Sequence, residues 1–505
     1  MVDQLTSFVL NAYGGTVCKT PHIDALAARG VVFDNAYCPY PLCAPSRFGM
    51  MSGRLPSRIG AYDNGAEFTA STPTFAHYLR AAGYYTCISG KMHFVGPDQF
   101  HGFEERLTTE IYPADMSWTP EPSFGDVTGD DERAYEFGVS TIDTVRDAGP
   151  VARSMQIDYD EDVIHHAIRE LYARARGEDQ RPFLMAVSLT HPHDPYVITQ
   201  EHWNRYSDEE IDAPKVPHID VGARDPHSQS LYYHYGQDKC TLSDADYRNA
   251  RRGYYGMISY VDDLFGRLML ALGDSGFAGN TLVIFASDHG DMIGERGMWF
   301  KKTLFDPAIR VPLIIAYPGH APARVSAPVN LVDIFPTLFG VASVKPAEIK
   351  TPLDGRSLIP ALEGKPVTGP VFIEHIDGGT AAPRVCVRDG KKKLVLSRAY
   401  PAQLYDLAAD PLELTNLAGV GDPEEVRLTQ LAEQTWPLDT LQDAVIASQT
   451  ARKIVDRALA IGREEIWDFI PRPLTQNTNY VRRGDSFPTV ERRGYLHYPK
   501  KRIYQ

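Results

Sequence analysis

Four nearly continuous apolar segments limit most strongly how this chain can fold. They are 84-YYTCIS-89, 183-FLMAVSL-189, 281-TLVIFAS-287 and 311-VPLIIAY-317. Short runs of this kind, without alternating polar residues, are typical of strands that are buried on both faces of a sheet. Because they alternate with helical segments along residues 1–365, they predict an α/β fold with a large, mostly parallel sheet sandwiched by helices.

Helices can be placed in this region from their start signals. Thr20-Pro21 precedes 22-HIDALAARG-30, and Thr72-Pro73 precedes 74-TFAHYLRAAG-83. In both, the threonine can cap the helix while the proline takes its first position. A longer helix is predicted over 243–272, where apolar residues recur at helical spacing.

The pattern changes near residue 366. The segments 370-PVFIEH-375, 384-RVCVRDG-390 and 391-KKKLVLSR-398 alternate like antiparallel strands, with a hairpin turn at Asp389-Gly390. We therefore expect a second, smaller α+β domain with an antiparallel sheet over residues 366–460.

Both ends of the chain carry expectations of their own. Residues 461–505 are rich in Arg, Pro and Tyr with little periodicity, so we expect a tail that is disordered or wraps a neighbouring subunit of a homo-oligomer. Met1-Val2-Asp3-Gln4 resembles the end of a strand whose beginning is missing, which suggests a truncated start.

Composition excludes several classes of protein. The net charge of −14 argues against binding to nucleic acid. No apolar run approaches the ~20 residues that span a bilayer. The chain has no basic-then-apolar leader, and its six cysteines are sparse and fit no metal spacing. We therefore expect a cytoplasmic protein without a membrane partner.

Polar residues follow the predicted strands at the point where each strand ends. Gly90-Lys91-Met92-His93, His191-Pro192-His193-Asp194 and Asp288-His289-Gly290 follow the first three runs, and the short first strand leads into Asp3. A single such residue usually belongs to a turn. Because open α/β sheets bind ligands outside the carboxyl ends of their strands, four such ends together predict an active site.

The residue types at these ends suggest a metal and an anionic substrate. Asp3, Asp288 and His289 are candidate metal ligands, since two carboxylates suit a hard cation and the histidine would tolerate manganese or zinc. The cationic donors expected around the metal are Lys91, His93, His193 and Lys301. This combination suits a tetrahedral anion whose charge moves to a leaving oxygen.

The segment 42-LCAPSRFGMMSG-53 leaves three interpretations of Cys43 open: a buried thiol, half of a disulfide with Cys38, or a nucleophile. A disulfide is disfavoured in a reducing cytoplasm. Arg47 lies one helical turn from Cys43, so we expect it to orient that side chain. The start of a helix also lowers a cysteine pKa and attracts anions.

These motifs together resemble the type I, formylglycine-dependent sulfatase family. Cys43 to Gly53 is similar to the family signature Cys-x-Pro-Ser-Arg, and the other motifs follow in family order. They are 90-GKMH-93, 192-PHDPY-196, 287-SDHGDMIGERG-297, 301-KKTLFDPAIRVPLII-315 and 404-LYDLAADPLELTNLA-418. Two positions depart from the pattern: Gln4 stands where many sulfatases have a second aspartate, and His289 where many have asparagine.

The resemblance implies an alkaline-phosphatase-like fold and a specific chemistry. A maturing enzyme would convert Cys43 to formylglycine, whose hydrate attacks sulfur with one hydroxyl and releases sulfate with the other. Arg47 and Lys91 would hold the sulfate, His193 or Lys301 would protonate the leaving alcohol, and His93 would act as base. Position 43 would join the metal ligands, with Ca²⁺ expected and Mn²⁺ or Mg²⁺ as alternatives.

Within the family, several segments resemble the choline-sulfatase branch, among them 112-YPADMSWTP-120 and 190-THPHDPYV-197. A quaternary ammonium group needs aromatic faces and a counter-charge. Trp118 is the expected aromatic residue, with Glu374 and Asp377 as candidate counter-charges. The alternatives are another small alkyl or aryl sulfate, a phosphonate monoester or phosphodiester as substrate, or an inactive sulfate-binding protein.

Overall fold

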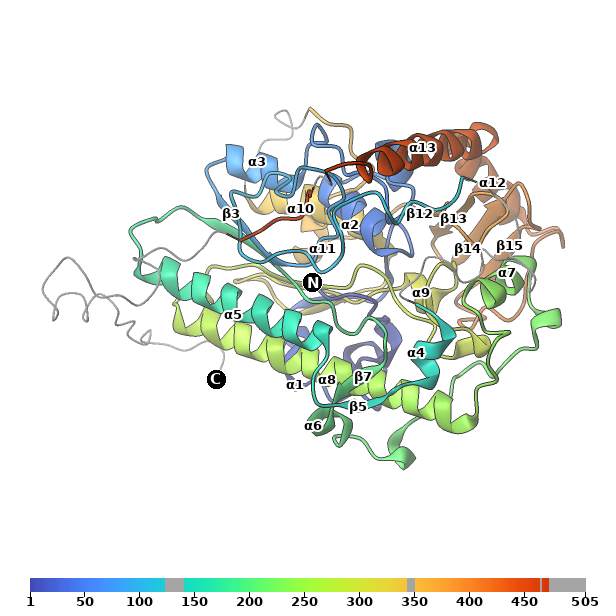
Figure 1. Ribbon diagram of the computed structural model, residues 1–505, viewed down its shortest axis with the longest axis horizontal. Coiled ribbons are helices and arrows are strands. Elements are labelled where there is room, and N and C mark those ends of the chain that lie inside the picture. Colours follow the sequence, from blue (N-terminus) through green and yellow to red (C-terminus); the bar gives the residue numbers. More distant parts are fainter. Residues whose placement is uncertain (123–139, 343–349, 464–465, 472–505) are drawn as a thin grey trace, which may run out of the picture.

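The structure is a computed structural model that describes residues 1–122, 140–342, 350–463 and 466–471. Its helices cover a central sheet on both faces, and a second, antiparallel sheet lies at one end of the molecule (Figure 1). The predicted tail over 461–505 lies mostly outside the described residues, and the proposed domain boundaries stay predictions.

The helices differ greatly in length, and the long helices α5 and α8 lie side by side under the sheet (Figure 1). In chain order they are α1 (Pro21–Ala27), α2 (Cys43–Ser52), α3 (Phe75–Ala81), α4 (Ile142–Arg146), α5 (Met155–Arg176), α6 (Gln200–Trp203), α7 (Pro226–His234), α8 (Asp244–Asp274), α9 (Asp306–Ile309), α10 (Ile334–Val341), α11 (Ile359–Leu362), α12 (Pro423–Thr435) and α13 (Leu438–Leu459).

The strands are short. In chain order they are β1 (Val31–Phe33), β2 (Ala36–Tyr37), β3 (Tyr85–Gly90), β4 (Glu105–Arg106), β5 (Gly149–Val151), β6 (Phe183–Ser188), β7 (Val197–Thr199), β8 (Val283–Ala286), β9 (Leu313–Ala316), β10 (Ala323–Val325), β11 (Val329–Asn330), β12 (Val371–His375), β13 (Arg384–Asp389), β14 (Lys392–Ser397) and β15 (Gln403–Asp406). The four apolar segments of the sequence form β6, β8, β9 and all of β3 except its last residue, Gly90, as predicted.

The N-terminal residues join two groups of strands into one sheet. One group has the order β4-β3-β6 and the other β10-β1-β9-β8. The Leu189 amide donates to the Met1 carbonyl (3.0 Å), and the Val2 amide donates to the Ala286 carbonyl (3.0 Å). Since β9 runs antiparallel to β1 and β8 while the other pairings are parallel, the sheet is mostly parallel.

Each face of this sheet has its own apolar layer. Helices α5 and α8 cover one face, where Ile164 and Phe265 belong to one core cluster. Helices α2, α3 and α10 cover the other, where Phe48 and Phe335 belong to a second. A cavity of about 230 Å³ lies between β6 and β8, and its lining is mostly apolar. Because both faces of the sheet are covered, an active site can form only at the ends of the strands.

One of the two helix starts predicted from the sequence is correct, and the other is wrong. Helix α1 begins after Thr20 as predicted, but Asp262 of α8 accepts its first amides, from His22 (3.1 Å) and Ile23 (2.7 Å). For α3 the predicted cap at Thr72 is wrong, because Thr74 caps the helix in a box with His77. The capping box of Thr74 and His77 fixes the start of the helix two residues after the Thr72-Pro73 signal.

The second sheet has the order β12-β13-β14-β15 and is antiparallel throughout. The predicted hairpin between β13 and β14 is present, but Asp389 still pairs with Lys392, so the turn is Gly390-Lys391, one residue later than predicted, and Gly390 has a φ of 53°. Helix α12 packs on this sheet, which makes the second unit α+β. Among the described helices, none is both long and apolar enough to cross a membrane.

A buried triad of charged side chains connects the second sheet to the part of the chain that forms the central sheet and its helices. Lys393 of β14 contacts Asp306 of α9 (2.9 Å) and Glu413 (2.5 Å), and all three side chains are buried. Burial opposes the charge of Lys393, but the two carboxylates outweigh burial and raise its pKa. The lysine therefore pairs with two acids that meet at this junction.

We expect Lys393→Met to destabilise the protein by about 3–5 kcal/mol, because it leaves two buried carboxylates without their cation. The free energy of unfolding in urea measures this loss. The matched control is Lys391→Met on the same hairpin: Lys391 is 65% exposed and pairs with Asp406 at 3.3 Å, so about 0–1 kcal/mol is expected. Equal losses in the two variants would contradict the structural role of the triad.

Candidate active site

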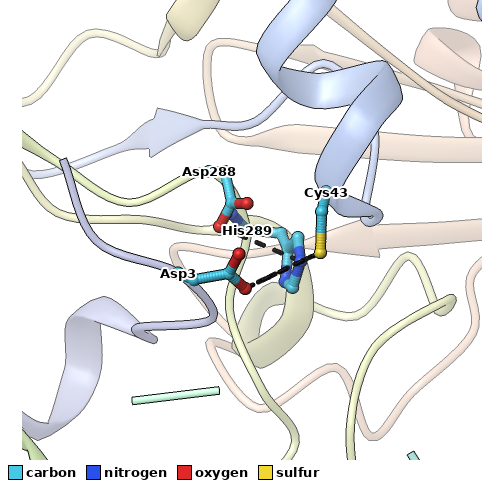
Figure 2. Close-up of side chains that lie close together, drawn as sticks. All are labelled: Asp3, Cys43, Asp288 and His289. Carbon is cyan, nitrogen blue, oxygen red and sulfur yellow. Dashed lines mark hydrogen bonds and ion pairs between the residues drawn. The ribbon is translucent and has the colours of Figure 1, made fainter. Parts of the chain in front are cut away.

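The strand ends bring the predicted site residues together. Asp3 follows the N-terminal segment, Asp288 and His289 follow β8, and Cys43 is the first residue of α2 (Figure 2). All four side chains are buried. The carboxyl ends of neighbouring strands thus converge on the start of one helix, as expected for this class of sheet.

Arg47 links the two aspartates. Its Nε donates to Asp288 Oδ2 (2.8 Å), its Nη2 donates to Asp3 Oδ2 (2.9 Å), and its Nη1 donates to Ser188 Oγ (2.8 Å). We expected Arg47 to orient Cys43, but these hydrogen bonds join Arg47 to Asp3, Asp288 and Ser188 instead. The guanidinium reaches past the cysteine and fixes the two carboxylates instead.

Lys91 is positioned by the residue before it. Gly90 has a φ of +105°, and a Cβ there would lie 2.0 Å from the Ser188 carbonyl oxygen, so only glycine fits. The Lys91 amide bonds the same carbonyl (3.0 Å), and its Nζ forms an ion pair with Asp3. This tight turn aims the lysine into the site.

The four side chains in Figure 2 have a geometry that suits a metal ion. One ligand atom from each of Asp3, Cys43, Asp288 and His289 lies within 4.8 Å of the other three. Burial would raise the pKa of Asp3, but neighbouring cationic groups, chiefly Lys91 and also Arg47, outweigh it and hold that pKa well below its usual range. Asp3 is therefore available as a carboxylate ligand.

His289 presents the correct nitrogen to this cluster. Its Nδ1 lies 3.0 Å from the Gly290 carbonyl oxygen, so the tautomer with a proton on Nδ1 leaves the Nε2 lone pair free. Nε2 lies 3.2 Å from Cys43 Sγ and 3.7 Å from Asp3 Oδ1. A second hydrogen bond of this kind is the usual support of a metal-binding histidine.

Gln4, where many sulfatases have an aspartate, does not face the carboxylate pair. Its Nε2 donates to Asp194 (3.1 Å) and Asp291 (2.6 Å), and its Oε1 accepts from Lys301 (2.5 Å). The amide therefore connects Lys301 to two buried acids. Two carboxylates and one imidazole remain as the ligands that the chain offers beside position 43.

Cys43 is a poor nucleophile in its unmodified form. Burial, followed by the charge of Asp3, raises the pKa of its thiol to about 11, so the thiol is protonated at neutral pH. All six cysteines lie in the described part of the chain and are unpaired. This excludes the Cys38–Cys43 disulfide and leaves the buried-thiol and nucleophile interpretations.

Lys301 and His193 form a pair beside Cys43. Lys301 Nζ lies 2.6 Å from His193 Nε2 and 3.7 Å from Cys43 Sγ. His193 Nδ1 lies 2.7 Å from the Asp194 carbonyl, which fixes the proton on Nδ1. Burial and the charge of Lys301 hold the pKa of His193 well below its usual range. The lysine is thus the proton donor and the histidine its acceptor.

His93 stands against an aromatic wall. Its ring centroid lies 5.0 Å from that of Tyr112 and 5.4 Å from that of Trp118, and neither ring nitrogen has a hydrogen-bond partner among the described residues. Burial, followed by the charge of Lys91, holds the pKa of His93 well below its usual range. His93 is therefore a neutral imidazole in this site.

Tyr112 is a site residue that the sequence analysis missed. Its ring lies 4.2 Å from Lys91 Nζ and 4.8 Å from the Trp118 ring, and its buried hydroxyl has no partner among the described residues. It lies in the segment 112-YPADMSWTP-120 already singled out. Tyr112 and Trp118 are six residues apart, a spacing that matches neither a helix nor a strand. The sequence therefore offered no reason to place the two rings together.

The two predicted counter-charges lie in different surroundings. Glu374 of β12 is fully buried and accepts from the Ser57 amide (2.8 Å) and Trp436 Nε1 (2.6 Å), contacts that favour a structural role. Asp377 pairs with Lys302 at 2.7 Å, next to the active-site lysine. A role of either residue in binding substrate stays a prediction.

Comparisons with known proteins agree with this site. Residues 1–344 match the sulfatase family, and residues 294–439 match the family of the C-terminal region of N-sulphoglucosamine sulphohydrolase. The chain is 42% identical over 499 residues to a choline-sulfatase of Rhizobium meliloti, covering 97% of this chain and 96% of that protein. It is 28% identical over 450 residues to an arylsulfatase of Clostridium perfringens, covering 83% and 89%.

The fold has relatives among solved structures. The phosphonate monoester hydrolase of Agrobacterium radiobacter superposes with a TM-score of 0.67 at 26% identity, over 87% of this chain and 94% of that one. The expected alkaline-phosphatase-like α/β fold with a smaller antiparallel sheet is confirmed. The chain therefore belongs to the sulfatase family of sulfuric ester hydrolases, and it is similar to a choline-sulfatase along almost its whole length.

Proposed function

We propose that this protein hydrolyses the sulfate ester of a small alcohol, with choline sulfate as the first candidate, through a formylglycine formed from Cys43. The observation that carries the proposal is the placement of Lys301 and His193 beside Cys43, on a site that also holds Arg47 and Lys91. Cationic donors surround the position where a sulfate group would be attacked.

Formylglycine would supply, in its hydrated form, one hydroxyl for attack and a second for release of sulfate. Lys301, hydrogen-bonded to His193 Nε2, would deliver a proton to the leaving alcohol oxygen as the sulfur–oxygen bond breaks. His93, neutral and without a hydrogen-bond partner among the described residues, would accept the proton from the second hydroxyl.

Asp3, Asp288 and His289, with the side chain at position 43, would hold one divalent cation, which would supply positive charge next to the sulfate oxygens. Buried carboxylates favour Ca²⁺, with Mn²⁺ or Mg²⁺ as alternatives.

A maturing enzyme is the partner that this chemistry requires. Cys43, Pro45 and Arg47, the residues such an enzyme is expected to read, are all buried. We therefore infer that Cys43 is modified before the chain folds. Assembly into a homo-oligomer and a cytoplasmic location stay predictions.

A phosphonate monoester or phosphodiester is the second candidate substrate, because the fold superposes on a phosphonate monoester hydrolase at 26% identity. A comparison of kcat/KM for matched sulfate and phosphonate esters of one alcohol decides between them. A faster phosphonate reaction would overturn the sulfate assignment.

The formylglycine proposal predicts an aldehyde at position 43. In protein made with a maturing enzyme, we expect the peptide ending at Arg47 to react with a hydrazide probe. Cys43→Ala should lower kcat by at least about 10³-fold, since no nucleophile remains, while Cys386→Ala, which removes another buried thiol, should keep activity. An unmodified Cys43 in active protein would contradict the mechanism.

The metal proposal predicts a gain in stability on binding. A divalent cation at 100 times its Kd should add about 2.7 kcal/mol to the free energy of unfolding, and Asp288→Asn should abolish most of this gain. Differential scanning calorimetry with Ca²⁺, Mn²⁺ and Mg²⁺ measures it. Asp263→Asn is the control, because Asp263 belongs to a separate acidic cluster with Glu201 and His202; if it removed the gain instead, the ion would bind there.

The choline proposal predicts that Trp118 contributes to binding through its aromatic face. Trp118→Ala should raise KM for choline sulfate by about 2- to 30-fold, corresponding to the about 0.5–2 kcal/mol of a cation–π contact. The uncharged isostere 3,3-dimethylbutyl sulfate is the control substrate and should be much less affected. Equal effects on the two esters would show that Trp118 recognises shape and not charge.

A further inference from the structure

We propose that Arg452 of α13 is a positioning residue that fixes two loops of the active site at once, one next to the nucleophile position and one that carries the aromatic wall. Its predicted effect on substrate binding rests on the proposed function, whereas its effect on the loops does not.

Arg452 forms a bidentate pair with Asp63. Its Nη1 donates to Asp63 Oδ1 (2.7 Å) and its Nη2 donates to Asp63 Oδ2 (2.7 Å), while Nη1 also donates to Thr119 Oγ1 (2.8 Å). Arg452 is 7% exposed, and Asp63 and Thr119 are fully buried. A planar guanidinium with two parallel bonds to a carboxylate has little freedom to move.

The first branch of this contact leads to Cys43. Asp63 Oδ1 accepts from the Gly65 amide (3.0 Å), which fixes the turn that contains Asn64. Asn64 Oδ1 accepts from the Ala44 amide (3.0 Å), the residue directly after Cys43. A shift of Asp63 would therefore move the hydrogen bond that holds the first turn of α2.

The second branch leads to Trp118. Thr119 follows Trp118, whose ring lies 5.4 Å from His93. The two loops are also in direct contact, because a Cβ on Gly65 would lie 2.3 Å from the Thr119 amide nitrogen. Arg452 thus holds both loops from one point, and it comes from a helix that packs with the second unit of the chain.

The chemistry of arginine matters for this role. Its fork bonds two carboxylate oxygens and the threonine hydroxyl together, whereas a lysine in its place would bring one point charge. Gln449 of α13 also donates to Asp63 Oδ2 (3.3 Å), so the carboxylate keeps this partner and the Gly65 amide when the arginine is replaced. The second unit of the fold therefore contributes to the precision of the site.

The experiment uses Arg452→Lys, Thr119→Val and the control Arg457→Lys, an exposed arginine on the same helix. Hydrogen–deuterium exchange is measured on peptides that contain residues 43–45, 62–66 and 116–120. Arg452→Lys should raise exchange in all three, and Thr119→Val in the last segment alone, while Arg457→Lys should change none. Unchanged exchange in Arg452→Lys would overturn the proposal.

Kinetics then separate positioning from general stability. Thr119→Val should raise KM for choline sulfate about fivefold with kcat within about twofold, and Arg452→Lys should lower kcat about tenfold for choline sulfate and for 4-nitrophenyl sulfate alike. In the double variant, Thr119→Val should add little to Arg452→Lys, because the two residues are in contact. Fully additive effects would show that the two residues act independently.

Failure of the proposed function gives a different result. If the wild-type protein hydrolyses no sulfate ester but exchange rises in Arg452→Lys as described, the proposed substrate is wrong and the positioning role stands. If the wild type is active and neither kinetics nor exchange changes in Arg452→Lys, the positioning role is wrong and the proposed function stands.

Discussion

The bond between Arg47 and the two aspartates is the contact on which the active site depends. Asp3 and Asp288 come from chain segments far apart in the sequence, and one buried guanidinium holds them side by side. Two buried carboxylates that share one guanidinium would repel each other if no cation lay between them. The arginine of the signature motif is therefore a structural requirement of the site as well as a candidate sulfate ligand.

Much of the fold and of the site could be predicted because both follow from local rules. Buried strands appear as continuous apolar runs, and parallel strands place their carboxyl ends at one edge, so Lys91, His193 and Asp288 were predicted to meet. The hairpin between β13 and β14 has a local turn signal in Asp389-Gly390, which locates the turn to within one residue. In each case, the residues that carry the information are neighbours in the sequence or lie at equivalent ends of strands.

What could not be predicted depends on partners far along the chain. The cap of α1 comes from Asp262, the role of Gln4 depends on Asp194 and Asp291, and the buried contacts of Glu374 depend on Ser57 and Trp436. No local pattern records such contacts, because they form only when separate elements pack. Tyr112 was not predicted for the same reason, because its part in the site depends on the position of its ring next to Lys91.

The positive side chains around Cys43 have a consequence for the end of the proposed reaction. Arg47, Lys91 and Lys301 face the carboxylates Asp3 and Asp288 inside a buried site, and a divalent ion would add to that charge. An alkyl sulfate carries one negative charge, whereas inorganic sulfate carries two. If the chain acts as proposed, this site would attract the dianionic product more strongly than the monoanionic ester group, so that departure of sulfate, rather than bond cleavage, would be the slow step.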